Sequence, residues 1–229
     1  FDRYGTGDAY AAAVNESIAF AGAEVDFFAR LKADDLVRAV ERLLGPAAGV
    51  SALDVGCGPG ATDAHLVGRL GKLAGCDVSA GVLEAARRAQ PSVDYRLAEG
   101  DRLPFADGAV DVAFAICVLH HVDPSERGVL AGELARVVRP GGLVAVYEHN
   151  PLNPLTRVAV ARCEFDEGVR LLRAREVRRR LVAAGLEPIE TRYIAFLPWR
   201  GAALRLVERA LAPLPLGAQH VVLARRPDG

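Results

Sequence analysis

The sequence predicts an α/β fold in which one mostly parallel sheet is covered by helices on both faces. Short, continuous apolar runs alternate with helical stretches after residue 50, and a glycine-rich turn follows the first of these runs. The chain has 229 residues, of which 51% are hydrophobic, so it can bury one sizeable core. The last two apolar runs have no helical crossover between them, so we expect the sheet to end in a hairpin-like pair.

The first part of the chain is expected to be helical. Apolar residues recur at helical spacing, and Gly45-Pro46 ends the pattern, which predicts two helices between residues 11 and 44. We interpret residues 1–45 as a helical N-terminal cap, or lid, on a single domain that spans residues 1–229. The apolar positions are Phe27, Phe28, Leu31, Leu36, Val37, Val40 and Leu44.

Strands and helices then follow in alternation. The expected strands are Val50–Val55, Leu73–Cys76, Val93–Leu97, Val110–Ile116, Leu143–Glu148, Ile189–Phe196 and Val221–Ala224. The expected helices are Ala61–Leu70, Ala80–Ala89, Ser125–Val138 and Ala174–Ala184. Residues 149–173 and 197–217 are longer than connections in such folds need. We expect both insertions to shape a substrate pocket, with peripheral packing as the alternative.

The charge and composition of the chain argue against nucleic-acid-binding and membrane proteins. The net charge of −1 argues against a dedicated nucleic-acid or polybasic membrane protein, and the arginine cluster at 173–180 fits a solvated helix face. No apolar run reaches the ~18 residues of a membrane-spanning helix. Residues 1–10 do not predict a signal peptide. The four cysteines form no CxxC motif. We therefore expect a reduced, cytoplasmic protein, as a monomer or homodimer, without nucleic-acid or membrane partners.

A glycine-rich turn is the strongest local motif. Leu53-Asp54-Val55-Gly56-Cys57-Gly58-Pro59-Gly60 follows a predicted strand and precedes a predicted helix. Asp77 ends the next predicted strand, about twenty residues after Gly56, where a carboxylate can accept hydrogen bonds from a ribose diol. The pair predicts a cofactor that contains a nucleoside; a purely structural turn is the alternative.

The residues around the turn bear on which cofactor binds. Gly56, Gly58 and Ala61 satisfy the dinucleotide pattern G-x-G-x-x-G/A, in which a helix N-terminus holds a pyrophosphate. Asp54, however, would place a negative charge beside the phosphates, and Pro59 removes a backbone donor. A cofactor with a cation near the turn fits better. S-adenosylmethionine has one, the ammonium of its methionyl part.

Several further motifs share the order and spacing of a known family. Asp77-Val78-Ser79, Leu103-Pro104-Phe105, Val110–Phe114 and Leu119-His120-His121-Val122 follow the glycine turn. Glu133-Leu134 and Arg136–Gly142 come next. Together with the turn, these motifs, over about residues 50–148, resemble the class I S-adenosylmethionine-dependent methyltransferases. The resemblance implies a Rossmann-like, seven-stranded sheet with a reversed last strand, and methyl transfer from S-adenosylmethionine.

The resemblance also implies roles for the nucleoside-binding residues. Asp54 would lie near the ammonium through water, Asp77 would hold the ribose hydroxyls, and Val78 would pack on adenine. Glu99 would accept from the adenine amino group while the Gly100 amide meets a ring nitrogen, with Asp101 as a competing candidate. The turn residues that would line the methionyl and ribose portions are Gly56, Cys57, Gly58 and Gly60.

The methionyl end would be completed by residues from two other segments. Ile116 and Cys117, just beyond the fourth strand, would pass beside the methionyl group. Tyr10 and Lys32 lie in N-terminal helices that often close over this cofactor, and Lys32 would pair with its carboxylate. A solvated helix face is the alternative for Lys32.

Catalytic candidates are sought at the ends of the fourth and fifth strands. The donor is already activated, so the protein must position the acceptor and, where needed, remove a proton. His121 follows the fourth strand, and Glu148 and His149 follow the fifth; histidine suits the task because its ordinary pKa is about 6.5. The alternative for His121 is packing at a helix start, where Asp123 and Glu126 predict a capping box. His65 and His220 look like surface residues. The cysteine, histidine and acidic residues show no clear metal-ligand spacing in the sequence, so no metal is expected.

The expected activity is methyl transfer to oxygen, nitrogen or an activated carbon of a small-molecule acceptor. An RNA or protein methyltransferase is the rival within the fold, but Cys117-Val118-Leu119-His120 differs from the aromatic Asn/Asp-Pro-Pro-Tyr type of motif that would favour it. Rivals from other classes are an NAD-dependent oxidoreductase and a non-catalytic cofactor-binding subunit.

Overall fold

The structure, a computed structural model, describes residues 15–16, 24–196 and 210–228. Seven strands form one sheet in the order β3-β2-β1-β4-β5-β7-β6. Strand β7 is antiparallel to both of its neighbours, and the other pairs are parallel. The predicted seven-stranded sheet with a reversed last strand is therefore confirmed. The strands are β1 (Ser51–Val55), β2 (Lys72–Asp77), β3 (Asp94–Leu97), β4 (Val110–Ile116), β5 (Val138–His149), β6 (Glu187–Ile194) and β7 (Gln219–Arg225).

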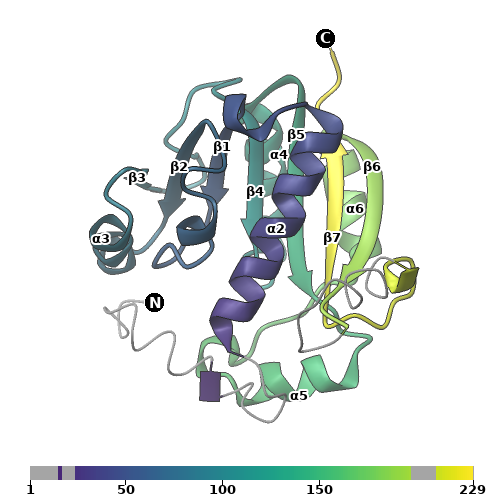
Figure 1. The fold of residues 1–229 in the computed structure, drawn as a ribbon. Coiled ribbons are helices and arrows are strands. Elements are labelled where there is room, and N and C mark those ends of the chain that lie inside the picture. Colours follow the sequence, from purple (N-terminus) through teal and green to yellow (C-terminus); the bar gives the residue numbers. More distant parts are fainter. Residues whose placement is uncertain (1–14, 17–23, 197–209, 229) are drawn as a thin grey trace.

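Helices cover both faces of this sheet. Figure 1 shows α2 in front of the central strands, with α4 and α6 behind them. On β4, Phe114 packs in the core cluster that contains Leu36 of α2, whereas Ala113 packs in the cluster that contains Leu134 of α4. The alternation follows from the period of a strand, and it confirms the two-sided sheet. The helices are α2 (Val25–Leu43), α3 (Ala80–Ala89), α4 (Arg127–Val137), α5 (Pro154–Arg162) and α6 (Ala174–Ala183).

Helix α2 is part of the core. Its Asp35 is buried, accepts a hydrogen bond from the Tyr147 hydroxyl at 2.9 Å, and forms an ion pair with Arg192. These contacts join α2 to β5 and β6, so this part of the expected N-terminal cap is a layer of the fold. The other expected N-terminal helix falls mostly on residues 1–14 and 17–23, which lie outside the described residues, as do residues 197–209 of the second insertion.

The predicted helix Ala61–Leu70 is wrong. The structure has only a short 3₁₀ helix there, η4 (Asp63–His65), surrounded by turns. Thr62 and Asp63 are buried, and the Asp63 carboxylate accepts from the Tyr95 hydroxyl at 2.7 Å, which draws this segment against β3. Gly68, with a φ of +76°, then interrupts any continuation. No regular α-helix therefore begins behind the glycine turn.

Two further expectations need correction. Helix α4 begins at Arg127 without a side-chain cap, so the predicted capping box is absent; Asp123 instead accepts from the Ser125 amide at 2.8 Å, in the turn before the helix. His220 is fully buried and not at the surface. It lies on β7, which is covered on both faces and bordered by β5 and β6.

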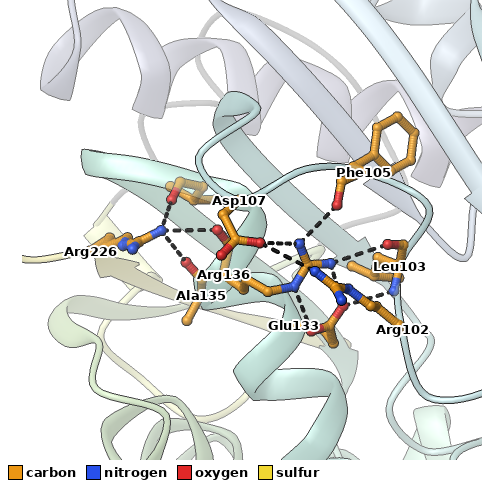
Figure 2. A network of polar contacts seen from close by, with 9 residues as sticks. Arg102, Leu103, Phe105, Asp107, Glu133, Ala135, Arg136 and Arg226 are labelled. Carbon is orange, nitrogen blue, oxygen red and sulfur yellow. Dashed lines mark hydrogen bonds and ion pairs between the residues drawn. The ribbon is translucent and has the colours of Figure 1, made fainter.

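The Leu103-Pro104-Phe105 segment is held by α4 (Figure 2). Glu133 accepts from the Leu103 amide at 2.8 Å, and Arg136 donates to the carbonyls of Leu103 and Phe105 at 3.1 and 2.8 Å. Glu133 and Arg136 also pair with each other at 2.6 Å. This network fixes the chain just after β3, next to the cavity described below.

Candidate functional site

A cavity of about 760 Å³ opens where β1, β2, β4 and β5 end. In a parallel α/β sheet, ligands bind at this carboxyl edge. The N-terminal part of α2 and four residues of α5 supply further walls. Of the predicted site residues, Tyr10 lies outside the described part, and Gly60, Glu99 and Glu148 do not line the cavity. Those that line it are Lys32, Asp54, Gly56, Cys57, Gly58, Asp77, Val78, Gly100, Ile116, Cys117, His121 and His149.

The glycine turn depends on backbone angles that favour glycine. Gly56, Gly58 and Gly60 have φ values of +75°, +53° and +79°. A Cβ on Gly56 would lie 2.5 Å from a Val118 methyl group, and one on Gly60 would lie 2.7 Å from the Tyr95 hydroxyl. Gly60 therefore packs inside the fold, whereas Gly58 has open space beside it and faces the cavity.

Asp77 is oriented by two backbone amides. Its Oδ2 accepts from the Gly58 amide at 2.9 Å, and its Oδ1 accepts from the Ser79 amide at 3.0 Å. A carboxylate has about four acceptor sites, so Asp77 can still accept from a diol. The neighbouring Val78 is 69% exposed and lines the cavity, which leaves an apolar surface beside the carboxylate.

The segment after β3 offers a different carboxylate from the one expected. Glu99 is exposed, pairs with Arg102 through an isolated backbone β-bridge, and does not line the cavity. Gly100 and Asp101 do line the cavity. The structure thus favours Asp101, the competing candidate, for contact with a base.

Asp54 and Asp63 form a buried carboxyl pair. Asp54 is 3% exposed and Asp63 is fully buried, and one oxygen of each has no hydrogen-bond partner among the described atoms. Burial, together with Asp63 and Asp77, raises the pKa of Asp54 well above its usual range; burial raises the pKa of Asp63 to about 6. Two such carboxyls share a proton. At neutral pH the pair therefore carries less negative charge than two isolated carboxylates would.

A histidine–carboxylate cluster stands at the ends of β4 and β5. His120 Nδ1 lies 2.6 Å from Glu148 Oε2, and its Nε2 lies 3.3 Å from Asp166 Oδ1. His121 Nε2 lies 3.3 Å from the same Asp166 oxygen. Glu148 is fully buried and also accepts from the Leu119 amide at 2.7 Å, so it positions His120 and does not reach the cavity.

The charges in this cluster are unequal. Burial opposes a charge on His120, yet Glu148 and Asp166 together raise its pKa to about 10. Burial, reinforced by the charge of His120, lowers the pKa values of His121 and His149 to about 4. His121 and His149 are therefore neutral at pH 7 and each keeps a lone pair. Asp166 had no signal in the sequence, because it lies 46 residues from His120 in an insertion.

Helix α5 closes the far side of the cavity. Asn153 caps it, accepting from the amides of Leu155 and Thr156 at 2.9 and 3.1 Å, and donates to the Leu216 carbonyl at 2.7 Å. Thr156 donates to the Ala218 carbonyl at 2.9 Å. These bonds attach α5 to the segment that leads into β7. Leu155, Ala159 and Val160 make this side of the cavity largely apolar.

The end of β4 carries unusual backbone geometry next to the cavity. Cys117 has a φ of +57°, which is uncommon for a residue with a side chain. Its amide donates to the Tyr147 carbonyl at 2.8 Å, and Gln219 donates to its sulfur at 3.6 Å. Such conformations persist where the surroundings enforce them, and they cluster at functional sites.

Comparisons with known proteins agree with this geometry. Residues 53–146 match a family model described as a methyltransferase domain. A demethylmenaquinone methyltransferase of Beutenbergia cavernae is 34% identical over 111 residues, which cover 48% of this chain and 45% of that protein. The chain spans about half or less of the length of the curated relatives it matches.

Solved structures share the fold. A methyltransferase from Thermotoga maritima, described as a possible histamine N-methyltransferase, superposes with a TM-score of 0.63 at 21% identity, covering 86% of this chain and 90% of that one. The [4+2]-cyclase SpnF gives 0.60 at 23% identity, covering 86% and 82%. No helix in the described parts of the chain is long and apolar enough to cross a membrane.

Proposed function

Because the chain belongs to the class I S-adenosylmethionine-dependent methyltransferases, we propose that it methylates a small-molecule acceptor at oxygen, nitrogen or an activated carbon. One observation carries the proposal. One cavity is lined both by the glycine turn and Asp77, which would form a nucleoside-binding edge, and by apolar residues of α5, which would form an acceptor compartment. A cofactor held at the first edge would face an acceptor held in the second.

The residues at the first edge fit S-adenosylmethionine. Asp77 has acceptor capacity left for the ribose, and exposed Val78 offers a surface for adenine. The buried, unpartnered oxygen of Asp54, which lines the cavity, suits an ammonium, and Lys32, which is also buried in the cavity lining, suits a carboxylate. When bound, the cofactor supplies an activated methyl group.

The other residues then have positioning and proton-accepting roles. The apolar wall of α5 would orient the acceptor and exclude water. His149 lines the cavity at the end of β5 and would accept the acceptor's proton when the reaction releases one. The demethylmenaquinone methyltransferase relative supports an acceptor that is neither a protein nor a nucleic acid, since its name refers to a quinone.

The rival functions have weaker support. A dinucleotide-dependent oxidoreductase needs a helix N-terminus for the pyrophosphate, and residues 60–71 form only η4 and turns. A non-transferase activity has one specific point in its favour, the shared fold of the cyclase SpnF. No feature of the described residues favours an RNA or protein acceptor over a small molecule.

A ligand comparison tests the proposal. S-adenosylhomocysteine at 100 times its Kd should stabilise the protein by about 2.7 kcal/mol, or roughly 5–10 °C in Tm. NADH should leave the Tm unchanged. Methyl transfer from labelled S-adenosylmethionine to a panel of phenols, quinols and amines then separates a methyltransferase from a cofactor-binding protein. Stabilisation by NADH alone would refute the proposal, and cofactor binding without transfer to any acceptor would favour the cyclase-like rival.

A further inference from the structure

We propose that His120, His121 and Asp166 form a site for one divalent transition-metal ion in the wall of the cavity. One ligand atom from each residue lies within 4.8 Å of the other two. All three residues line the cavity. The site goes beyond methyl transfer as such, because the proposed reaction does not require a metal.

The spacing of the ligand atoms fits a metal ion. Zn²⁺ binds imidazole nitrogen and carboxylate oxygen at about 2.0–2.2 Å, so neighbouring ligand atoms of a tetrahedral site lie roughly 3.4 Å apart. Nε2 of His120 and Nε2 of His121 each lie 3.3 Å from Asp166 Oδ1. The two imidazole rings come from consecutive residues, and their centroids lie 4.1 Å apart. An ion could therefore enter with only small movements of the three side chains.

A buried carboxylate already orients the first ligand. Glu148 accepts from His120 Nδ1 at 2.6 Å, which leaves Nε2 of His120 directed toward Asp166 and His121. Metal-binding histidines commonly donate their other ring N–H to a carboxylate, which fixes the ring and strengthens the ligand. Glu148 is itself held by the Leu119 amide, so the support is rigid.

The ligand set indicates the kind of ion and its use. Two imidazoles and one carboxylate suit Zn²⁺, Fe²⁺ or Co²⁺, whereas Mg²⁺ and Ca²⁺ prefer oxygen ligands. Three protein ligands leave at least one position open, and because all three residues line the cavity we expect that position to be reached from it. We assign it to an oxygen atom of the acceptor; this assignment rests on the proposed function, while the metal site does not.

Binding of Co²⁺ to the full chain tests the site through its visible absorption. We expect one Co²⁺ per chain, displaced by Zn²⁺, and at least tenfold weaker binding by His121→Ala, which removes a ligand at the cavity surface. Glu148→Gln should weaken binding by about 10–100-fold without removing any ligand. His65→Ala is the matched control, because His65 pairs with Asp26 at 2.7 Å elsewhere in the fold and should bind Co²⁺ like the wild type.

Circular dichroism of the same samples shows that each variant is folded, and their S-adenosylhomocysteine affinity separates the two proposals. A wild type that binds S-adenosylhomocysteine but no stoichiometric Co²⁺ overturns the metal site and leaves the proposed function standing. Equal Co²⁺ affinity in the wild type and in His121→Ala also overturns the metal site. The wild type could instead bind Co²⁺ but not S-adenosylhomocysteine, while His121→Ala loses Co²⁺ binding. That result supports the metal site, and the proposed function fails.

Discussion

Replacing Asp63 by Asn should make the protein more stable at neutral pH. In the folded protein Asp63 is fully buried, packs against Asp54 and accepts from the Tyr95 hydroxyl. The asparagine carbonyl can keep the bond from Tyr95, and its amide can donate to the unpartnered oxygen of Asp54. The substitution therefore removes a buried charge without changing the size of the side chain.

The magnitude follows from the pKa of Asp63, which burial raises from 3.8 to about 6. A raised folded-state pKa means that the folded protein binds the proton more tightly than the unfolded chain. Its stabilising contribution is complete below about pH 3.8 and is lost as the pH rises through about 6. Two pKa units correspond to about 3 kcal/mol, so the advantage of Asp63→Asn should approach this value above pH 7.

Urea unfolding of wild type and variant between pH 4 and pH 8 measures the effect. Carboxylates such as Glu133 and Asp111, whose pKa values are lowered, destabilise both proteins equally in acid, so the informative quantity is the difference in unfolding free energy. That difference should grow as the pH rises from 4 to 7. Asp94→Asn, at an exposed carboxylate paired with Arg96, should show no such growth. A constant difference for Asp63→Asn would refute the shared proton.

Three further predictions concern the cofactor edge, the proton acceptor and α5. Asp77→Ala should weaken S-adenosylhomocysteine binding by roughly 1–3 kcal/mol in calorimetry, because charge-assisted hydrogen bonds are lost; unchanged affinity would remove Asp77 from the ribose site. His149→Ala should lower turnover by about 10²–10⁴-fold while S-adenosylhomocysteine affinity stays the same, and full activity would show that His149 is not the base. Asn153→Ala should destabilise the protein by about 1 kcal/mol or more in urea unfolding, because the α5 cap and the bond to the Leu216 carbonyl are both lost; an unchanged stability would contradict this role.

The apolar periodicity of the sequence predicted the bounds of several helices and strands correctly. The bounds of β4 and α3 agree with the predicted Val110–Ile116 and Ala80–Ala89, because apolar periodicity and burial coincide there. The periodicity failed at Ala61–Leu70, where burial of Asp63 against Tyr95 overrides helical propensity.

The part of the site that is formed by one short motif and the end of the next strand could be predicted from the sequence. The glycine turn and Asp77 lie together as their spacing along two adjacent parallel strands suggests. Burial at the strand ends could not be predicted from spacing, and so Glu148, expected in the cavity, lies beneath it. Asp166 reaches His120 only through the path of the insertion, which no periodic pattern encodes.

The interior position of β7 has a consequence for synthesis on the ribosome. Residues 219–225 emerge after β5 and β6, yet both of those strands pair with them. Until they emerge, β6 has no neighbour in the sheet and α5 lacks its attachment at residues 216–218. The nucleoside edge can thus be assembled early, while the acceptor compartment is completed only when β7 is inserted. A nascent chain halted before residue 219 should therefore be protease-sensitive beyond β5 and protected before it.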